Sequence, residues 1–186
     1  MNERILEGAL RVFKEKGPKF TMDDLATEMK MSKKTIYTVF NDKNELMCQM
    51  VDYAFDLIKE AEDKIYGNNE LSTIEKLRAI LVVLPEVNYG FDYSSMKQLG
   101  DKYPMAYEKL CSRLENGWDT TFDLIETGKR EGTIRDVNLE IFKLMYGSSV
   151  EKLLMGKFLK ESEMDYPTAL KDVVDVLIDG IIIKGK

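Results

Sequence analysis

Between residues 17 and 46 the chain carries three helix-start signals in close succession, which limits this stretch to short helices joined by tight turns. An apolar stripe with three- and four-residue spacing predicts one helix before it. That helix stops at Gly17-Pro18, because glycine accepts the left-handed C-terminal conformation and proline cannot continue a helix. Thr21 is placed to cap a second helix, and Asp24, three residues on, can return the bond.

Two further caps define the next two helices. Ser32 is a good N-cap for a short third helix that ends near Phe40. Asp42, with Glu45 in the return position, opens a fourth helix whose apolar period continues to Gly67. A longer helix followed by a short helix, a turn and a second short helix is the helix-turn-helix layout. This layout presents its second short helix to a DNA major groove.

The rest of the chain is also typical of helices, with no alternating strand pattern and no internal repeat. We expect a turn at 68–72, a loop at 88–95, a helix end or kink at Pro85, and helices over 74–87, 105–132, 138–160 and 167–184. The predicted fold class is therefore all-α. It combines an N-terminal three-helix helix-turn-helix DNA-binding domain, residues 1–46, with a larger C-terminal helical ligand-binding and dimerisation domain, residues 47–186.

Charge is distributed unevenly along the chain. The net charge of −6 at first argues against a polyanionic partner. Residues 1–50, however, hold nine Lys or Arg against eight Asp or Glu, and residues 30–43 hold four lysines against Asp42 alone. This asymmetry indicates that one face of a small N-terminal unit meets an anion while the acidic remainder keeps the protein in solution.

The polar side chains of the third helix are suited to this contact, because each is able to reach a base edge, a thymine methyl group or a phosphate. Lys43 lies in the first turn of the fourth helix, where the helix dipole disfavours a lysine, so its placement favours an external anion. We expect Thr21, Tyr37 and Lys43 to hold the DNA backbone. The predicted DNA-binding residues are Thr21, Ser32, Lys33, Lys34, Thr35, Tyr37, Thr38 and Lys43.

The last helix has an apolar stripe from Leu170 to Ile181 that is too wide for a helix covered on one side only. A copy of the same chain is the simplest second partner. We therefore predict a homodimer in which the last two helices of each chain form a four-helix bundle. The predicted dimerisation residues are Val150, Leu153, Val173, Leu177, Ile178 and Ile181.

Several other classes of protein are disfavoured. The chain has no histidine, the usual proton carrier at neutral pH, and no nucleophile-elbow or phosphate-loop motif, so we do not expect an enzyme. Cys48 and Cys111 show no metal-ligand spacing, and we expect structural thiols, no metal and no cofactor. Charged residues interrupt the apolar runs, so we expect a cytoplasmic protein without a membrane segment.

Residues 5–50 resemble the N-terminal domain of the TetR family of bacterial transcriptional regulators. The resemblance rests on ILEGALRVFKEKG, on FTMDDLATEMKMSKKTIYTVF and on FNDKNEL, in which Phe40, Lys43, Glu45 and Leu46 form the specific pattern. It implies a homodimer, operator binding by two such units and a C-terminal helical domain that senses a ligand. Two-fold symmetry of the protein predicts a palindromic double-stranded DNA operator. We expect a repressor, although the sequence does not distinguish repression from activation. The alternative is a helical ligand-binding or protein-interaction module that no longer reads DNA.

The sequence indicates the ligand site only weakly. Aromatic side chains are suited to line an apolar pocket for an unknown small-molecule effector between about residues 80 and 150, although an ordinary core explains most of them equally well. A domain that only dimerises, or one that responds to a peptide or protein partner, remains an alternative. The candidate ligand-binding residues are Tyr89, Phe91, Tyr93, Tyr107, Trp118 and Tyr146.

Overall fold

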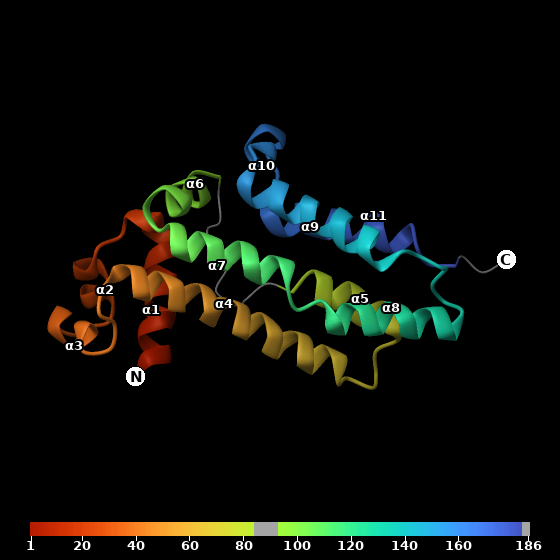
Figure 1. Ribbon diagram of the computed structural model, residues 1–186, viewed down its shortest axis with the longest axis horizontal. Helices are drawn as coiled ribbons and strands as arrows, with labels where there is room; N and C mark the ends of the chain where they lie inside the picture. Colours follow the sequence, from red (N-terminus) through yellow and green to blue (C-terminus); the bar gives the residue numbers. More distant parts are fainter. Residues whose placement is uncertain (84–92, 184–186) are drawn as a thin grey trace. The chain divides into compact units, whose positions relative to one another are not determined.

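A computed structural model describes residues 1–83 and 93–183 of the chain. These residues are almost entirely helical, and the only strand-like pairing among them is an isolated one between Ile134 and Ile182. The predicted all-α fold class is confirmed. The elements, labelled in Figure 1, are α1 (Asn2–Lys16), the 3-10 turn η1 (Gly17–Lys19), α2 (Met22–Glu28), α3 (Lys33–Tyr37), α4 (Lys43–Tyr66), α5 (Thr73–Leu81), α6 (Tyr93–Lys102), α7 (Pro104–Glu115), α8 (Asp119–Glu131), α9 (Leu139–Met155), α10 (Phe158–Ser162) and α11 (Tyr166–Asp179).

The described residues separate into two compact units. Unit 1 comprises residues 1–57 and 93–113, and unit 2 comprises residues 58–83 and 114–183. Both α4 and α7 contribute residues to each unit. The domain boundary predicted after residue 46 falls within α4 and stays a prediction about the extent of the DNA-binding part.

The core of unit 1 holds α1, α2 and α3 together. The apolar stripe of α1 is buried at Ile5 and Phe13, which expose 0% and 1% of their surface. Leu25 of α2 and Ile36 of α3 are both 0% exposed. α1 and α2 approach closely at Gly8 of α1, where a Cβ atom would lie 2.0 Å from the sulfur of Met29.

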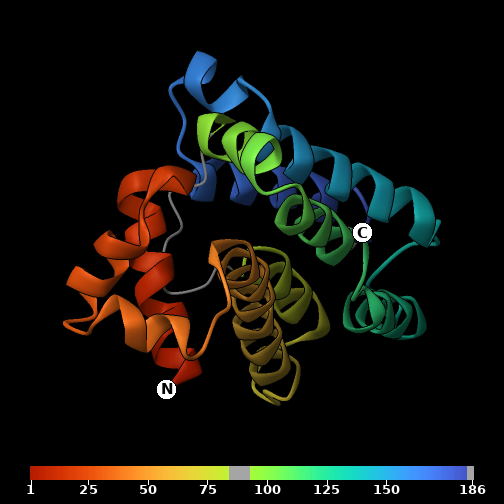
Figure 2. The ribbon, with the colours of Figure 1, turned by 60° about the vertical axis from the view of Figure 1, so that its left-hand side comes forward.

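In unit 2, α5 packs against α8 and α11, and α9 packs against α11. Figures 1 and 2 both show α9 and α11 lying side by side. The contact between α5 and α11 includes ion pairs from Arg78 to Asp175, at 2.6 Å, and to Asp179. The isolated pairing of Ile134 with Ile182 joins the segment after α8 to the segment after α11.

Several helix boundaries differ from the prediction. The helix expected over 105–132 is divided into α7 and α8, because Gly117 between them adopts a φ of 84°, outside the helical region. The helix expected over 138–160 ends at Met155, with Gly156 as its C-cap, and α10 is separate from α9.

The helix expected over 167–184 ends at Asp179, because Arg135 and Thr133 form backbone hydrogen bonds with Ile181 and Ile183. The sequence did not predict α6, which begins at Tyr93, inside the end of the expected loop at 88–95. The helix expected over 74–87 ends earlier, at Leu81. Pro85 and the first part of the expected loop lie outside the described residues.

Two glycines with positive φ allow the backbone explanation of the break between α7 and α8 to be tested. Gly117→Ala is expected to lower the free energy of unfolding by about 1–2 kcal/mol, because an L-residue is strained at this φ. The new Cβ would also lie 2.9 Å from Cε of Lys59. Gly132→Ala is the control for backbone strain alone, since its φ is 72° and nothing lies within 4 Å of the added Cβ. Urea denaturation followed by circular dichroism measures both, and an unchanged Gly117→Ala protein would contradict the explanation.

Candidate DNA-binding surface

A reciprocal pair of hydrogen bonds fixes the start of α2. The hydroxyl of Thr21 accepts a hydrogen bond from the backbone N–H of Asp24 at 3.1 Å, and the Asp24 carboxylate accepts one from the backbone N–H of Thr21 at 2.6 Å. A bond from Lys16 is the largest cause that lowers the pKa of Asp24 far below its ordinary value, followed by the bonds from Thr21. The predicted capping pair is confirmed.

The turn from α2 to α3 is closed by its backbone. Lys30 adopts a φ of 51°, and the N–H of Met31 donates to the carbonyl of Ala26 at 3.0 Å. The hydroxyl of Ser32 then accepts the backbone N–H of Thr35 at 3.0 Å, so the predicted N-cap of the third helix is confirmed. α3 itself ends at Tyr37 instead of near Phe40.

One side of α3 is anchored and the other is presented to solvent. Ile36 and Phe40, one inside α3 and one just after it, are both 0% exposed and point into the core of unit 1. Ser32, Lys34, Tyr37 and Thr38 are exposed, and Tyr37 exposes 44% of its surface. α3 therefore presents one outer face of polar side chains and a phenol.

Lys34 and Lys33 differ in their surroundings. No hydrogen bond or ion pair holds the ammonium of Lys34 within residues 1–83 and 93–183. The ammonium of Lys33, in contrast, donates to the carboxylate of Asp23 in α2 at 2.7 Å, and this bond is the largest cause that raises the pKa of Lys33. Sequence reasoning missed Asp23 as a partner, because its place in the first turn of a helix already explains an acidic residue. Thr35 is half-buried, and its hydroxyl lies 2.8 Å from that of Ser32.

Lys43 differs most from the prediction. Its ammonium donates to the carbonyl of Pro18 at 2.9 Å and to the carbonyl of Phe20, and it lies 4.1 Å from the centroid of the Phe20 ring. Burial is the largest cause that lowers the pKa of Lys43 to about 8, and the charge of Lys102 lowers it further. The ammonium is directed at groups of its own chain, and a phosphate contact by Lys43 stays a prediction.

The first turn of α4 is also occupied by groups of the chain itself. The backbone N–H of Glu45 donates to the carboxylate of Asp42 at 2.8 Å, as the sequence predicts. The return bond differs from the expectation, because the Glu45 carboxylate accepts the backbone N–H of Asn41, at 2.8 Å. Two carboxylates of the chain itself therefore accept backbone N–H groups around this helix start.

The candidate ligand-binding residues that the structure describes are divided between the two units, and their role stays a prediction. Tyr107 belongs to unit 1, whereas Trp118 and Tyr146 belong to unit 2. Tyr89 and Phe91 lie outside the described residues, and of Tyr93 the structure describes only that it begins α6.

Trp118 and Tyr146 are in contact. Their rings lie edge to face with centroids 5.4 Å apart, and the hydroxyl of Tyr146 donates to the carbonyl of Leu81 at 2.7 Å. Burial is the largest cause that raises the pKa of Tyr146, with smaller contributions from Tyr166 and Glu62. Sequence reasoning missed Tyr166 and Glu62, because nothing in their local patterns distinguishes them from other helix residues.

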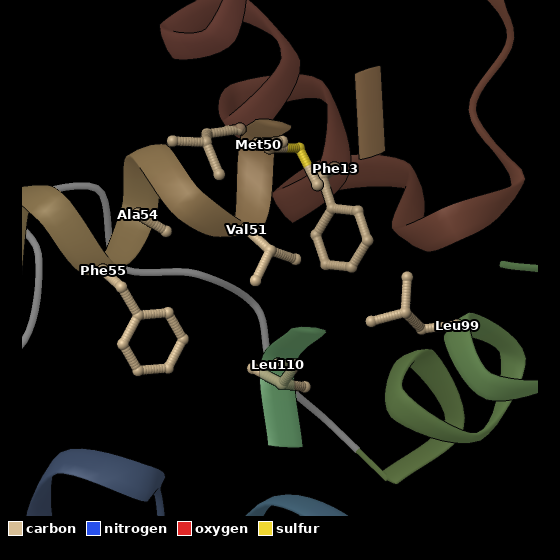
Figure 3. A pocket seen from close by; sticks show the side chains of 8 residues that line it. Phe13, Met50, Val51, Ala54, Phe55, Leu99 and Leu110 are labelled. Atoms are coloured by element: carbon tan, nitrogen blue, oxygen red, sulfur yellow. The ribbon is translucent and has the colours of Figure 1, made fainter. Parts of the chain in front are cut away.

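A small cavity lies within unit 1. Its volume is about 30 Å³, which suffices for one group the size of a water molecule. Side chains of α1 and α4 face Leu99 of α6 and Leu110 of α7 across it (Figure 3). All its lining residues are apolar: Leu10, Phe13, Met50, Val51, Ala54, Phe55, Leu99 and Leu110.

The predicted dimerisation residues are mostly buried inside a single chain. Leu177 is 9% exposed and Ile178 0%, because α11 packs on α9 and α5. Val150, Leu153 and Ile181 are buried as well, and Val173 is half-buried. The premise that this stripe needs a second chain to cover it is therefore wrong. The large apolar residues that stay exposed on the same two helices are Ile141, Leu144, Met145 and Val176.

No group of His, Cys, Asp and Glu side chains suited to a metal ion occurs in the described residues. The helices described also include none that is both apolar and long enough to span a bilayer.

Residues 5–50 match the family model described as "Bacterial regulatory proteins, tetR family". The chain is 29% identical over 181 residues to the uncharacterized HTH-type transcriptional regulator YvaF of Bacillus subtilis (strain 168), an alignment that covers 97% of this chain and 95% of that protein. Its fold is similar to a TetR transcriptional regulator from Chloroflexus aurantiacus J-10-FL, with a TM-score of 0.69, 18% identity, and 98% and 96% of the two chains covered. It is also similar to the transcriptional regulator FadR from Bacillus subtilis in complex with stearoyl-CoA, with a TM-score of 0.62, 15% identity, and 96% and 98% covered.

The reciprocal cap at Thr21 is expected to contribute measurably to stability. Thr21→Ala removes the acceptor for the Asp24 N–H and is expected to lower the free energy of unfolding by about 1 kcal/mol. Thr21→Ser is the matched control, because it keeps the hydroxyl. Chemical denaturation compares the two variants with the wild type, and equal stability of Thr21→Ala and Thr21→Ser would show that the hydroxyl does not act as a cap.

Proposed function

Because residues 5–50 match the TetR family of bacterial transcriptional regulators, we propose that this chain is a ligand-responsive repressor of that family and binds a roughly palindromic DNA operator as a homodimer. In this proposal α3 enters the major groove, and the predicted DNA-binding residues other than Lys43 make the contacts. A small molecule that binds in the helical C-terminal part changes the affinity for the operator. The protein acts on DNA in the bacterial cytoplasm.

The outer face of α3 is the observation that supports DNA binding. Helix α3 is anchored on its buried side, where Ile36 is fully buried, and its polar outer side is left facing solvent. Lys34 stands exposed without an internal partner among the described residues, so its ammonium is available to a phosphate or a guanine. Tyr37 is exposed enough to reach a phosphate with its hydroxyl.

The pairing of Lys33 with Asp23 sets a condition on binding. Lys33 has to give up the Asp23 carboxylate before it is able to contact DNA, and the carboxylate itself repels phosphate. Both side chains are largely exposed, at 43% and 72%, so the pair is weak and easily exchanged. When Lys33 binds DNA it therefore exchanges the Asp23 carboxylate for a phosphate, whereas Lys34 contacts DNA without giving up a partner.

Lys34→Ala is expected to weaken binding to a selected operator by about tenfold or more, whether the lost contact is to a phosphate or a base. A lost phosphate contact flattens the dependence of log K on log salt concentration by about 0.9, whereas a lost base contact changes the preferred sequence. Asp23→Asn is expected to strengthen binding, because it frees Lys33 and removes a negative charge. Lys160→Ala, on α10, is the matched control. The operator is first selected from genomic DNA, and unchanged affinity of Lys34→Ala would contradict the role of α3.

The exposed apolar residues of α9 and α11 support the dimer. Leu144 exposes 61% of its surface and Val176 73%, and both lie on helices that pack against each other. Leu144 and Met145 share a face of α9 with Ile141, since they lie three and four residues beyond it. A two-fold contact of this face with its copy forms a four-helix bundle without the residues that the chain already buries.

Leu144→Asp combined with Val176→Asp is expected to yield a 21.5 kDa species in sedimentation at micromolar concentration, because each of the two chains would bury two charges in the interface. The wild type is expected to sediment at twice this mass. Met105→Asp is the control, since Met105 is 70% exposed on α7. A double variant that remains dimeric would contradict the proposed face.

Contact between Trp118 and Tyr146 supports unit 2 as the place of effector binding. These rings, with Phe122 5.9 Å from Trp118, offer an apolar and aromatic surface, and Tyr146 adds one hydroxyl. FadR, whose fold is similar, has been solved in complex with stearoyl-CoA. Helix α4 contributes residues to both units, so a shift at its far end changes the separation of the two α3 helices in a dimer. Matching two grooves about 34 Å apart tolerates little such change.

An apolar or aromatic effector is expected to change Trp118 fluorescence and operator affinity together. A ligand that binds ~100-fold more tightly to a dimer with one separation of its α3 helices supplies about 2.7 kcal/mol of coupling free energy between the effector site and DNA binding. Trp118 is the one tryptophan of the chain, so a metabolite screen follows its emission directly. Tyr146→Phe keeps the ring but removes the bond to Leu81, and is expected to weaken effector binding. A compound that binds tightly without changing operator affinity would rule out coupling for that compound.

A further inference from the structure

The ammonium of Lys43 occupies a cation site formed by the chain itself. Two carbonyls accept its hydrogen bonds, that of Pro18 at 2.9 Å and that of Phe20. Two ring faces lie close to it, with the centroid of Phe20 at 4.1 Å and that of Tyr103 at 5.0 Å. Carbonyl oxygens and aromatic faces both attract a cation, so these groups replace part of the hydration that Lys43 loses.

The partners of Lys43 belong to two different parts of unit 1. Pro18 and Phe20 lie in and directly after η1, and Phe20 immediately precedes Thr21, which caps α2. Tyr103 lies between α6 and α7. One ammonium therefore contacts both the entry to the helix-turn-helix and the corner between α6 and α7. η1 and α6 also pack directly against each other.

The charges around Lys43 do not explain its placement. Lys102, at the end of α6, opposes the ammonium, and Asp24 is the acidic group that favours it. No ion pair to Lys43 occurs in the described residues, so carbonyl and ring contacts hold it instead.

We propose that Lys43 is a positioning residue that couples the α6–α7 corner, through Tyr103, to the start of α2, and thereby sets the affinity of α3 for DNA. A displacement of Tyr103 removes one side of the cation site, and the η1 turn loses a restraint directly before the cap of α2. This inference rests on the proposed DNA binding, and it assigns Lys43 a role inside the chain instead of on a phosphate.

Lys43→Met, Tyr103→Leu and the double variant test the coupling. Methionine keeps an unbranched stem of similar length without the charge, and leucine removes the aromatic face. Each single variant is expected to weaken operator binding by roughly fivefold. The double variant is expected to bind no more weakly than the single variant with the lower affinity. Tyr103→Phe keeps the ring and is expected to bind like the wild type.

The salt dependence separates positioning from a phosphate contact. A positioning role leaves the slope of log K against log salt unchanged in Lys43→Met, whereas loss of a phosphate contact flattens it by about 0.9. A flattened slope in Lys43→Met together with wild-type affinity of Tyr103→Leu would overturn the proposal. It would also be overturned if the loss of operator affinity in the double variant equals the product of the losses in the two single variants. If Lys43→Met does not fold, the comparison of Tyr103→Leu with Tyr103→Phe still decides the matter.

Amide hydrogen exchange provides a measurement that does not depend on DNA. Lys43→Met and Tyr103→Leu are both expected to speed exchange at Asp24 and Leu25, whose N–H groups are held by Thr21. Tyr103→Phe is expected to leave it unchanged. If the wild type binds no operator, the proposed function fails, while faster exchange in both variants still supports the coupling. Unchanged exchange in Tyr103→Leu would overturn it.

Discussion

Burial of one side of α3 is the interaction on which the DNA-facing surface depends. A five-residue helix has no stability of its own in water, because nucleation costs more than a few backbone bonds return. Its conformation is held instead by Ile36 and Phe40, which are fully buried in the core of unit 1, and by the cap at Ser32. The positions of the exposed residues of α3 depend on how well this core is packed. Substitutions in α1 or α4 that disturb the core therefore also disturb the DNA-facing surface.

Short-range patterns predicted much of unit 1. The caps at Thr21 and Ser32 depend on residues three positions away, and a sequence shows such pairs directly. The break at Gly117 was not predicted, because glycine inside an apolar stripe is also tolerated within a helix. Burial of Ile178 was not predicted either, since it depends on α5 and α9, which are distant along the chain. A wide stripe shows that a helix has several neighbours without showing whether they belong to the same chain.

Lys43 illustrates the limit of reasoning from charge. A lysine at the start of a helix is unfavourable to the dipole, and the sequence therefore indicated an anion. The structure resolves the same difficulty with two backbone carbonyls and two ring faces, none of which carries a charge. A sequence motif shows the residue type at such a position, but it does not show whether the side chain points to an external anion or to groups of its own chain.

The close approach of α1 and α2 at Gly8 restricts how the sequence is able to vary. A methyl group at this position would overlap Met29, whose side chain is itself buried against the core. A larger residue is compatible with the same helix spacing only if the Met29 side chain moves or a smaller residue stands at position 29. Positions 8 and 29 are therefore expected to change as a pair among related proteins, with total volume conserved, even though neither residue faces the DNA.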